Sequence, residues 1–269
     1  MKFNRLIVAV MATAILAAPA QAARCGNDGA GFNAWKAEFM KEARKAKIKK
    51  SVLDRALAPV TYNPTVVRLD RNQKSFRLSL DQFMQKRGAN QIIAKGKRLK
   101  AQNAALLKKI ERRYGVPPGV LMAIWGMETA FGGFSGNMSV VRSLATLAYD
   151  CRRAKFFTNE LLAALQIIQR GDMRSSQMIG AWAGEIGQTQ FLASNYIKYA
   201  VDFDGDGRRD LIRSRADVLA STANYLKAHG WKAGRGYQQG ERNYRAIKAW
   251  NSAGVYQKSI AIIAAKIDQ

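Results

Sequence analysis

The spacing of the apolar residues constrains the fold most strongly, because they recur three and four positions apart through long alanine-rich stretches. This period places apolar side chains on one face of an α-helix, whereas a strand would need them at alternate positions. Only 5 of the 269 residues are proline, so little interrupts such helices, and a chain that is 48% hydrophobic can bury a sizeable core. The pattern predicts a mainly helical, all-α protein.

Turn residues divide this pattern into separate helices. Residues 31–58 are typical of two short amphipathic helices, after which Pro59 and Pro64 break the pattern. A second helical group covers roughly residues 75–113 and closes at a Tyr-Gly pair. We further expect an ordinary core helix over residues 154–170.

A helix between these regions carries a carboxylic acid in strongly apolar surroundings. It opens at Pro117-Pro118, where a proline in the first turn costs no hydrogen bond, and runs to Glu128 before Gly132-Gly133 ends it. Neighbours such as Trp125 disfavour the charged form of the Glu128 carboxyl and raise its pKa. A carboxyl that stays protonated near neutral pH can donate a proton to a leaving oxygen, so Glu128 is a candidate catalytic acid. The alternatives are a surface glutamate and a buried one paired with arginine.

The composition argues against several other kinds of active site. The chain has one histidine, His229, which stands before a glycine at the end of a predicted helix and suits a capping role. A Ser-His-Asp site, a Cys-His site and a zinc site with several histidines are therefore disfavoured. The sequence has no GxxxxGK[ST] loop, which argues against nucleotide hydrolysis. Carboxylates remain for bond-breaking chemistry.

The first residues have the features of a secretory leader. Lys2 and Arg5 precede an apolar run over residues 6–18, and Ala20-Gln21-Ala22 matches a cleavage site. The apolar run is shorter than the ~20 residues that span a bilayer, which argues against the alternative of a membrane anchor. We therefore expect a signal peptide over residues 1–22 and an exported, periplasmic, soluble product with no transmembrane segment in the mature chain.

The net charge of +25 points to a polyanionic partner. Removal of the leader takes away two basic residues and lowers the charge to +23. In an exported protein, an anionic cell-wall polymer or anionic lipid replaces nucleic acid as the expected partner.

Export also bears on Cys25 and Cys151, which would form one disulfide in an oxidising compartment. A free, buried Cys151 is the alternative.

Two loop segments carry weaker signals. Three glycines fall within eight residues at Gly180, Gly184 and Gly187, where a backbone could approach a ligand closely, and Gln190 follows them with an amide suited to sugar hydroxyls or an acetamido group. The alternative is a turn between helices. The second segment is acidic and begins at residue 202.

This acidic segment has the opening of an EF-hand calcium loop. Acids stand at positions one, three and five and glycine at six: Asp202, Asp204, Asp206 and Gly207. Position twelve is Arg213, so the usual bidentate glutamate is missing, although Asp217 could serve in a longer loop. Asp217 also completes a capping box with Ser214. The pattern favours a hard-cation site over a turn whose acids bond their own backbone.

Six ordered motifs together resemble those of the lytic murein transglycosylase B family. They are Gly115-Val-Pro-Pro118, Trp125-Gly-Met-Glu-Thr129, Leu144-Ala-Thr-Leu147, Ala183-Gly184 with Gly187-Gln-Thr-Gln-Phe191, Tyr199-Ala-Val-Asp-Phe-Asp-Gly-Asp-Gly207, and Asn224-Tyr225 with His229-Gly-Trp231. The resemblance covers essentially the whole mature chain.

The resemblance implies a lysozyme-like catalytic domain over residues 114–269, an N-terminal helical region over residues 23–113 packed on it, and an EF-hand-like loop. It implies cleavage of the β-1,4 bond between N-acetylmuramic acid and N-acetylglucosamine in peptidoglycan by a monomer that needs no cofactor for the chemistry. Glu128 would protonate the glycosidic oxygen and then, as a base, take the proton from the muramoyl C6 hydroxyl, which closes onto C1 as a 1,6-anhydro end. No water attacks, and the substrate's acetamido oxygen replaces the second carboxylate of most glycosidases.

The motif positions imply further site residues. Two guanidinium groups, those of Arg152 and Arg153, would bind the carboxylates of the stem peptide. The sugar cleft would be lined by Gln190, Tyr225, Trp250, Asn251 and Tyr256. A structural Ca²⁺ would be held by Asp202, Asp204, Asp206, the Arg208 carbonyl and Asp217.

The chain departs from the family pattern at three positions. Ala181 stands where some members have a serine near the acid, and Ala193 stands where proline is usual. Glu185 stands where a small residue is common, and we expect it to face solvent, the alternative being a carboxylate close enough to alter the site's pH dependence. Two other functions stay open: a hydrolysing muramidase with Glu185 as its second carboxylate, and a non-catalytic cationic wall-binding protein.

Overall fold

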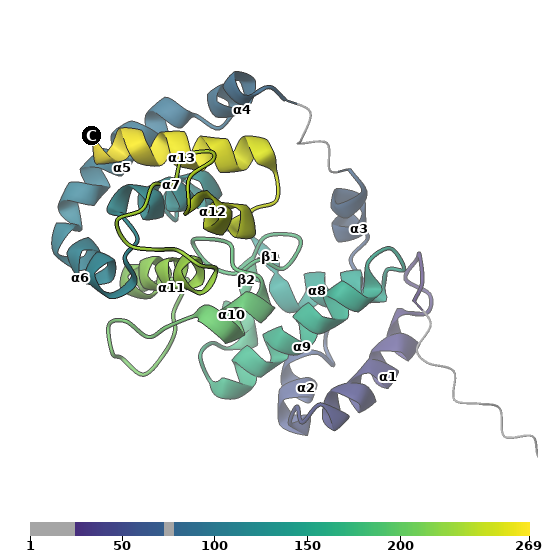
Figure 1. Cartoon of the computed structure of the whole chain (residues 1–269). Coiled ribbons are helices and arrows are strands. Elements are labelled where there is room, and N and C mark those ends of the chain that lie inside the picture. The colour runs from purple at the N-terminus through teal and green to yellow at the C-terminus, as the bar shows by residue number, and fades with distance from the viewer. Residues whose placement is uncertain (1–24, 73–77) are drawn as a thin grey trace, which may run out of the picture.

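The computed structural model describes residues 25–72 and 78–269, which form α-helices and one two-stranded sheet (Figure 1). The all-α prediction is confirmed for these residues. The predicted signal peptide, residues 1–22, lies outside them. Within the described ranges, none of the helices combines the length and apolar character that crossing a membrane requires.

Three short helices open the described chain: α1 (Phe32–Lys45), α2 (Lys50–Ala56) and α3 (Pro64–Arg71). The first two occupy the residues predicted for them. The prediction that Pro64 breaks the helical pattern is wrong, because Pro64 is the first residue of α3. A proline there loses no hydrogen bond, and the Asn63 side chain accepts a hydrogen bond from the Thr65 N–H at 3.1 Å.

The helical group predicted over residues 75–113 consists of three helices in the described residues: α4 (Leu80–Lys86), α5 (Ala89–Gln102) and α6 (Ala104–Tyr114). Gly88, with a φ of 67°, separates α4 from α5. Gly115, with a φ of 74°, ends α6 at the predicted place. Both angles lie in the left-handed region, which glycine adopts without strain.

The next helix, α7 (Pro118–Thr129), begins at the predicted proline but ends before the predicted Gly132-Gly133 pair. Two residues other than glycine end it, because Ala130 has a φ of 50° and Phe131 a φ of 65°. The Phe131 N–H donates to the Trp125 carbonyl at 3.2 Å and closes the last turn. The chain therefore leaves this helix earlier than its glycines suggest.

The second half of the chain contains six helices in the described residues: α8 (Val140–Tyr149), α9 (Ala154–Arg170), α10 (Ala193–Tyr199), α11 (Arg215–Ala228), α12 (Tyr244–Trp250) and α13 (Gly254–Asp268). The bounds of α9 are those predicted. An antiparallel pair joins β1 (Met138–Ser139) to β2 (Ile179–Gly180), with Met138 opposite Gly180. A short 3-10 turn (Ser175–Gln177) precedes β2.

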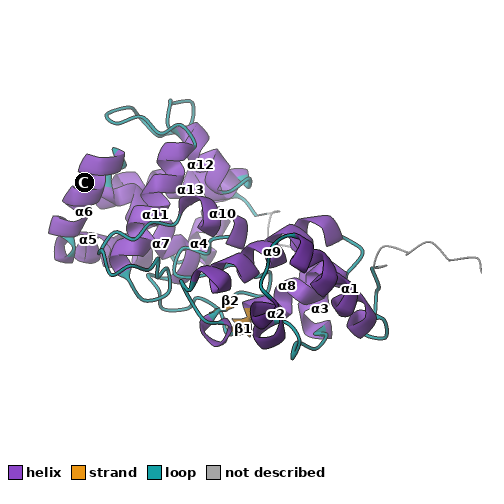
Figure 2. Ribbon diagram, turned by 90° about the horizontal axis from the view of Figure 1, so that it is seen from below, coloured by secondary structure: helices purple, strands orange, loops and turns teal. Residues whose placement is uncertain are grey.

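The helices form two neighbouring groups that share one hydrophobic core (Figure 2). In one group, α1 and α3 pack on α8, and α2 packs on α9. In the other, α7 packs against α5 and α13, and α6 packs against α11. α10 contacts both α9 and α11 and so links the groups. Helices from the N-terminal region belong to both groups, and the boundary at residue 113 stays a prediction.

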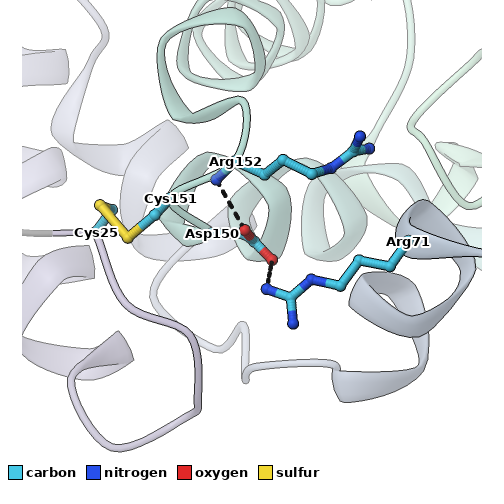
Figure 3. The surroundings of a disulfide bond; sticks show 5 residues. All are labelled: Cys25, Arg71, Asp150, Cys151 and Arg152. Carbon is cyan, nitrogen blue, oxygen red and sulfur yellow. Dashed lines mark hydrogen bonds and ion pairs between the residues drawn. A yellow bond between two sulfur atoms is a disulfide. The ribbon is translucent and has the colours of Figure 1, made fainter.

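A disulfide joins Cys25 to Cys151, whose Cα atoms are 4.9 Å apart (Figure 3). The structure thus decides between a disulfide and a free Cys151, which the sequence left open. Beside the disulfide, Asp150 accepts hydrogen bonds from the Arg152 backbone N–H and from the Arg71 guanidinium, both at 3.0 Å. These contacts attach the start of the described chain to the turn between α8 and α9.

Candidate active site

Glu128 interrupts an otherwise buried helix. All residues of α7 are buried except its first residue, Pro118, and Glu128. A helix that is apolar on all sides packs inside a core. The Glu128 side chain is the part of α7 that lines a pocket. The pocket has a volume of about 280 Å³.

Two donors from the C-terminal helices hold the Glu128 carboxyl. The Tyr256 hydroxyl donates to Glu128 Oε1 at 2.6 Å, and the Trp250 indole N–H donates to the same oxygen at 2.9 Å. Trp250 is the last residue of α12 and Tyr256 lies in the first turn of α13. Among the residues that the structure describes, no lysine or arginine forms an ion pair with Glu128. Neutral hydrogen-bond donors therefore orient this carboxyl.

Burial raises the pKa of Glu128 above its ordinary value of 4.5, because the charged form loses its contact with water. The hydrogen bonds from Tyr256 and Trp250 and the positive charge of Arg87 lower the pKa, since they favour the carboxylate. The negative charge of Glu185 raises it further. The net direction agrees with the expectation from the sequence.

The walls of the pocket come from the segment that precedes α10 and from α10, α11 and α12. The lining residues are Glu128, Glu185, Gln190, Phe191, Leu192, Asn195, Tyr225, Trp250 and Asn251. Four of the five residues expected in a sugar cleft are among them, whereas Tyr256 contacts Glu128 from a buried position. Sequence reasoning missed Leu192 and Asn195, whose residue types carry no distinguishing signal.

Gln190 and Tyr225 present specific groups to the pocket. The Gln190 amide nitrogen donates to the carbonyls of Ser135 and Gly187 at 3.2 and 2.9 Å, so its amide oxygen remains as an acceptor. The Tyr225 hydroxyl donates to the Ala249 carbonyl at 2.7 Å, which leaves the ring as its contribution. Both side chains are thereby fixed in place.

His229 has the structural role expected from the sequence. It follows the last residue of α11, and its Nδ1 lies 2.7 Å from the Tyr225 carbonyl oxygen. Its ring stacks on the Tyr225 ring with centroids 3.9 Å apart. His229 does not line the pocket.

The glycine-rich stretch brings protein segments together. A side chain at Gly184 would meet the Leu144 side chain, and one at Gly187 would meet the Leu211 carbonyl. These glycines therefore serve close packing within the fold, and none of the three lines the pocket. The alternative of a tight turn describes the segment better.

The expectation that Glu185 faces solvent is wrong, because Glu185 lines the pocket together with Glu128. Bridges between Gly180 and Ile186 and between Ile186 and Phe191 fold this segment back on itself. The Glu185 Oε2 atom is buried and has no hydrogen-bond partner in the described chain. Burial raises the pKa of this carboxyl as well.

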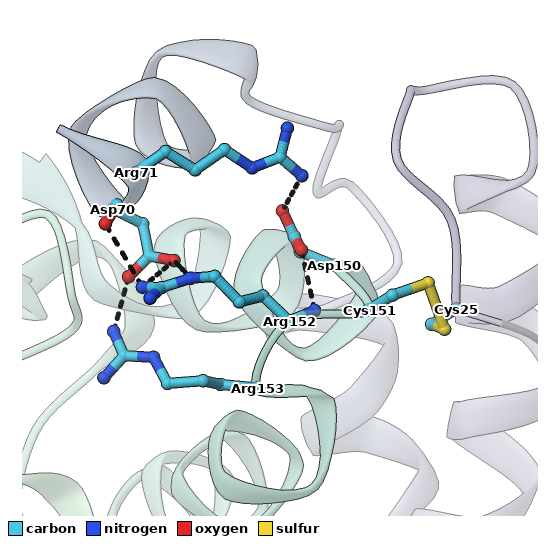
Figure 4. A network of polar contacts seen from close by, with 7 residues as sticks. All are labelled: Cys25, Asp70, Arg71, Asp150, Cys151, Arg152 and Arg153. Carbon is cyan, nitrogen blue, oxygen red and sulfur yellow. Dashed lines mark hydrogen bonds and ion pairs between the residues drawn. A yellow bond between two sulfur atoms is a disulfide. The ribbon is translucent and has the colours of Figure 1, made fainter.

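Arg152 and Arg153 do not line the pocket, and both bind the buried carboxylate of Asp70 (Figure 4). Arg152 Nε donates to Asp70 Oδ2 at 2.6 Å, and Arg153 donates to Asp70 Oδ1. The two arginine side chains remain 44% and 38% exposed. Sequence reasoning missed Asp70, which stands 82 residues before Arg152 and carries no local signal.

Three acids of the acidic loop form a cluster. Asp202, Asp204 and Asp217 each place one carboxylate oxygen within 4.8 Å of the others. Asp206 lies outside this cluster and accepts a hydrogen bond from the Arg208 N–H at 2.8 Å. Carboxylate oxygens are the ligands that calcium prefers, so the clustered residues fit a hard cation.

Asp217 connects this cluster to α11. It is fully buried, and its two oxygens accept hydrogen bonds from the Phe203 and Asp210 N–H groups at 2.7 and 2.8 Å. Ser214 accepts a hydrogen bond from the Asp217 N–H at 3.2 Å, as the predicted capping box requires. The reciprocal half of the box is absent from the described contacts, because the Asp217 carboxylate is engaged with the loop.

Comparisons with known proteins agree with this geometry. Membrane-bound lytic murein transglycosylase B of Escherichia coli (strain K12) is 41% identical over 122 residues, which are 45% of this chain and 34% of that protein. The chain thus matches about a third of the length of this curated relative. The crystal structure of SltB3 from Pseudomonas aeruginosa in complex with NAG-anhNAM-pentapeptide matches 88% of this chain and 79% of that chain, with a TM-score of 0.83 and 34% identity.

A third comparison bears on the fold alone. The Escherichia coli lytic transglycosylase Slt35 in complex with calcium matches 93% of this chain and 97% of that chain, with a TM-score of 0.77 and 24% identity.

The family model of the transglycosylase SLT domain matches residues 31–240, well over half of this chain. The chain therefore belongs to the transglycosylase SLT domain family.

Proposed function

We propose that this protein is a lytic murein transglycosylase that cleaves the β-1,4 bond between N-acetylmuramic acid and N-acetylglucosamine in peptidoglycan and leaves 1,6-anhydromuramoyl ends. The name of the Escherichia coli relative and the NAG-anhNAM-pentapeptide bound to SltB3 support this substrate class. The excess of basic residues suits a protein that acts on an anionic wall polymer.

The observation that carries the proposal is how the Glu128 carboxyl is held. Trp250 and Tyr256 both donate to Oε1, so a proton on this carboxyl must reside on Oε2. Burial favours the protonated form, and the same two donors stabilise the carboxylate once the proton has left. One group can therefore give up a proton and take one back.

The reaction uses both states of Glu128. As an acid it protonates the glycosidic oxygen while the bond from that oxygen to C1 of the muramoyl residue breaks. As a carboxylate it then removes the proton from the muramoyl C6 hydroxyl, whose oxygen forms the new bond to C1. The proton count on Glu128 is restored, and no water is consumed.

The remaining site residues bind substrate in this proposal. Gln190, Asn251 and the rings of Tyr225 and Trp250 line the sugar cleft, and Tyr256 orients Glu128. Arg152 and Arg153 contact carboxylates of the stem peptide through the exposed parts of their guanidinium groups. Their pairing with Asp70 fixes the direction in which they point.

A second function has one observation in its favour. Glu185 shares the pocket with Glu128, as a hydrolysing muramidase with two carboxylates requires. In that reaction Glu185 would activate a water molecule, and the product would carry a reducing end.

Mass spectrometry of the muropeptides released from purified sacculi tests these functions. We expect anhydro ends from the wild-type protein. Reducing ends with one added water would establish a muramidase, and binding without release would establish a non-catalytic wall-binding protein. Either result would refute the proposed transglycosylase.

We also propose a structural Ca²⁺ in the acidic loop, held by Asp202, Asp204 and Asp217, with Asp206 and the Arg208 carbonyl as further ligands. The clustered carboxylate oxygens support it. A cation that binds only the folded state stabilises that state by mass action. Calcium should therefore raise the melting temperature of the wild-type protein relative to a chelator, and Asp204→Ala should reduce this rise; no rise in either protein would leave the loop as an acidic turn.

The remaining proposals concern export and organisation. We propose that residues 1–22 are a signal peptide, and that the mature product is a soluble periplasmic monomer with a helical region over residues 23–113 and a catalytic core over residues 114–269. The intact mass of protein recovered from the periplasm should correspond to a chain that begins at Ala23. A mass that retains residues 1–22 would refute the cleavage.

A further inference from the structure

The carboxyl group of Glu185 lies in the same pocket as that of Glu128. Its backbone is fixed, because the Ala181 N–H donates to the Glu185 carbonyl and the next residue, Ile186, exchanges hydrogen bonds with Phe191 at 2.8 and 2.9 Å. Its Oε2 atom is buried without a hydrogen-bond partner in the part of the chain that is described. Such an atom costs stability, so its presence in the pocket calls for a role.

The charged groups near Glu185 in the described chain act on it without forming an ion pair. Arg153, which precedes α9, attracts the Glu185 carboxylate, but the Arg153 guanidinium already binds the carboxylate of Asp70. Glu160 of α9 repels it, although both Glu160 oxygens accept hydrogen bonds from Ser194. An ionised Glu185 therefore places a negative charge at the pocket that is not ion-paired within the described part of the chain.

Most of the groups around Glu128 favour its ionised form. Tyr256 of α13, Trp250 of α12 and Arg87 at the end of α4 all favour the ionised form of Glu128. Among the described residues whose charges act on Glu128, Arg87 favours the ionised form and Glu185 favours the protonated form. The negative charge of Glu185 thus helps to keep on Glu128 the proton that the proposed reaction transfers to the glycosidic oxygen.

We propose that Glu185 is a positioning residue whose negative charge holds the transferable proton on Glu128. The catalytic consequence rests on the proposed function. In this proposal Glu185 is the first of the two carboxyls to ionise. Arg153 and the backbone N–H groups of Ala183 and Glu185 favour its charged form, although burial raises its pKa. A second ionisation in the same pocket then meets like-charge repulsion, and Glu128 stays an acid to higher pH.

Carbon-13 NMR of the Glu128 carboxyl carbon tests this directly in the full chain labelled with carbon-13 glutamate, with the resonance assigned through Glu128→Gln. In Glu185→Gln the titration midpoint should fall by about half to one pH unit, the size of a like-charge effect at intermediate dielectric constant. Glu185→Asp keeps the charge and should restore most of the wild-type midpoint. Glu111→Gln removes an exposed carboxylate of α6 outside the pocket and should leave the midpoint unchanged.

An unchanged midpoint in Glu185→Gln would overturn the proposal, as would an equal fall in Glu111→Gln. The alkaline limb of the kcat profile should move with the NMR midpoint, and an equal loss of kcat at every pH without such a movement would make Glu185 a substrate contact instead. The NMR midpoint needs no substrate. A wild-type protein that releases no anhydro-muropeptides would therefore refute the proposed function while the midpoint still decides the role of Glu185.

Discussion

Glu128 and Asp70 are both carboxyl groups set into the body of the protein, and their partners differ. The Asp70 side chain is 1% exposed and is bound by the guanidinium groups of Arg152 and Arg153. Glu128 receives hydrogen bonds from a phenol and an indole and has no ion-pair partner among the described residues. Charge-assisted hydrogen bonds from two guanidinium groups hold the Asp70 carboxylate in place, whereas a buried carboxyl with neutral donors can exchange a proton.

In this protein the type of hydrogen-bond partner, more than burial, separates a carboxyl with a structural role from one that transfers a proton. Asp70 connects the end of α3 to the residues before α9, so its loss should appear in the free energy of unfolding. Glu128 connects a helix to a pocket, so its loss should appear in turnover.

The largest effect should come from Glu128→Gln. The amide has nearly the shape of the carboxyl but cannot transfer the proton, so we expect the rate of muropeptide release to fall by about a thousandfold. The melting temperature should not fall, because none of the described lysines or arginines is ion-paired with Glu128. Release at near the wild-type rate would show that Glu128 is not the acid.

Asp70→Asn should act on stability. Breaking a fully buried ion pair costs roughly 3–5 kcal/mol, but water screens Arg152 and Arg153, which are 44% and 38% exposed, and we therefore expect a loss of about 2 kcal/mol in denaturant unfolding. The matched control is Asp54→Asn, which removes an exposed carboxylate paired with Lys50 and should cost less than about 0.5 kcal/mol. Equal losses in the two variants would contradict the structural role of Asp70.

The pH dependence of stability should carry the signature of Glu128. Its pKa is raised in the folded protein, so its stabilising contribution is full below the ordinary value of 4.5 and is lost as the pH rises through the folded pKa. The unfolding free energy of the wild-type protein minus that of Glu128→Gln should therefore decrease from about pH 4.5 upward, by at most about 1.4 kcal/mol per pH unit. A difference that grows with pH would mean that the carboxylate, not the acid, is the favoured folded form.

Tyr256→Phe should have the smallest effect. It removes one hydrogen bond that favours the Glu128 carboxylate, so the pKa of Glu128 should rise and kcat should fall by about fivefold, or roughly 1 kcal/mol. The alkaline limb of the kcat profile, which reports the loss of the Glu128 proton, should move to higher pH. Tyr244→Phe, at a buried tyrosine of α12 outside the pocket, is the control, and an identical change in both variants would point to packing alone.

The ends of single helices could be predicted from the sequence. The bounds of α9, Ala154–Arg170, follow from its apolar period and from Gly171, whose φ of 83° stops the helix. The start of α3 was also encoded locally, since Asn63 and Pro64 form a usual helix start, but the proline was interpreted only as a break. Glu128 could be identified because its surroundings are contiguous in the chain.

Contacts between distant residues could not be predicted. Trp250 and Tyr256 stand 122 and 128 residues after the carboxyl that they orient. The orientation of Glu185 depends on bridges within its own segment and on helices packed against it, and spacing alone favoured solvent. Residue type and period describe one element at a time, whereas these contacts exist only once the elements pack.

The disulfide makes the first part of the molecule a closed covalent ring, because 126 positions separate Cys25 from Cys151. The ring contains α1 to α8 and with them Glu128, while Trp250 and Tyr256 lie in the open remainder of the chain. A single protease cut between the two cysteines would release no fragment, and the nicked protein would migrate as one species until a reductant separates the pieces. A single cut between Cys151 and Trp250 would instead break the covalent connection between the acid and both of its donors. The two parts of the active site therefore differ in how the break of one peptide bond affects them.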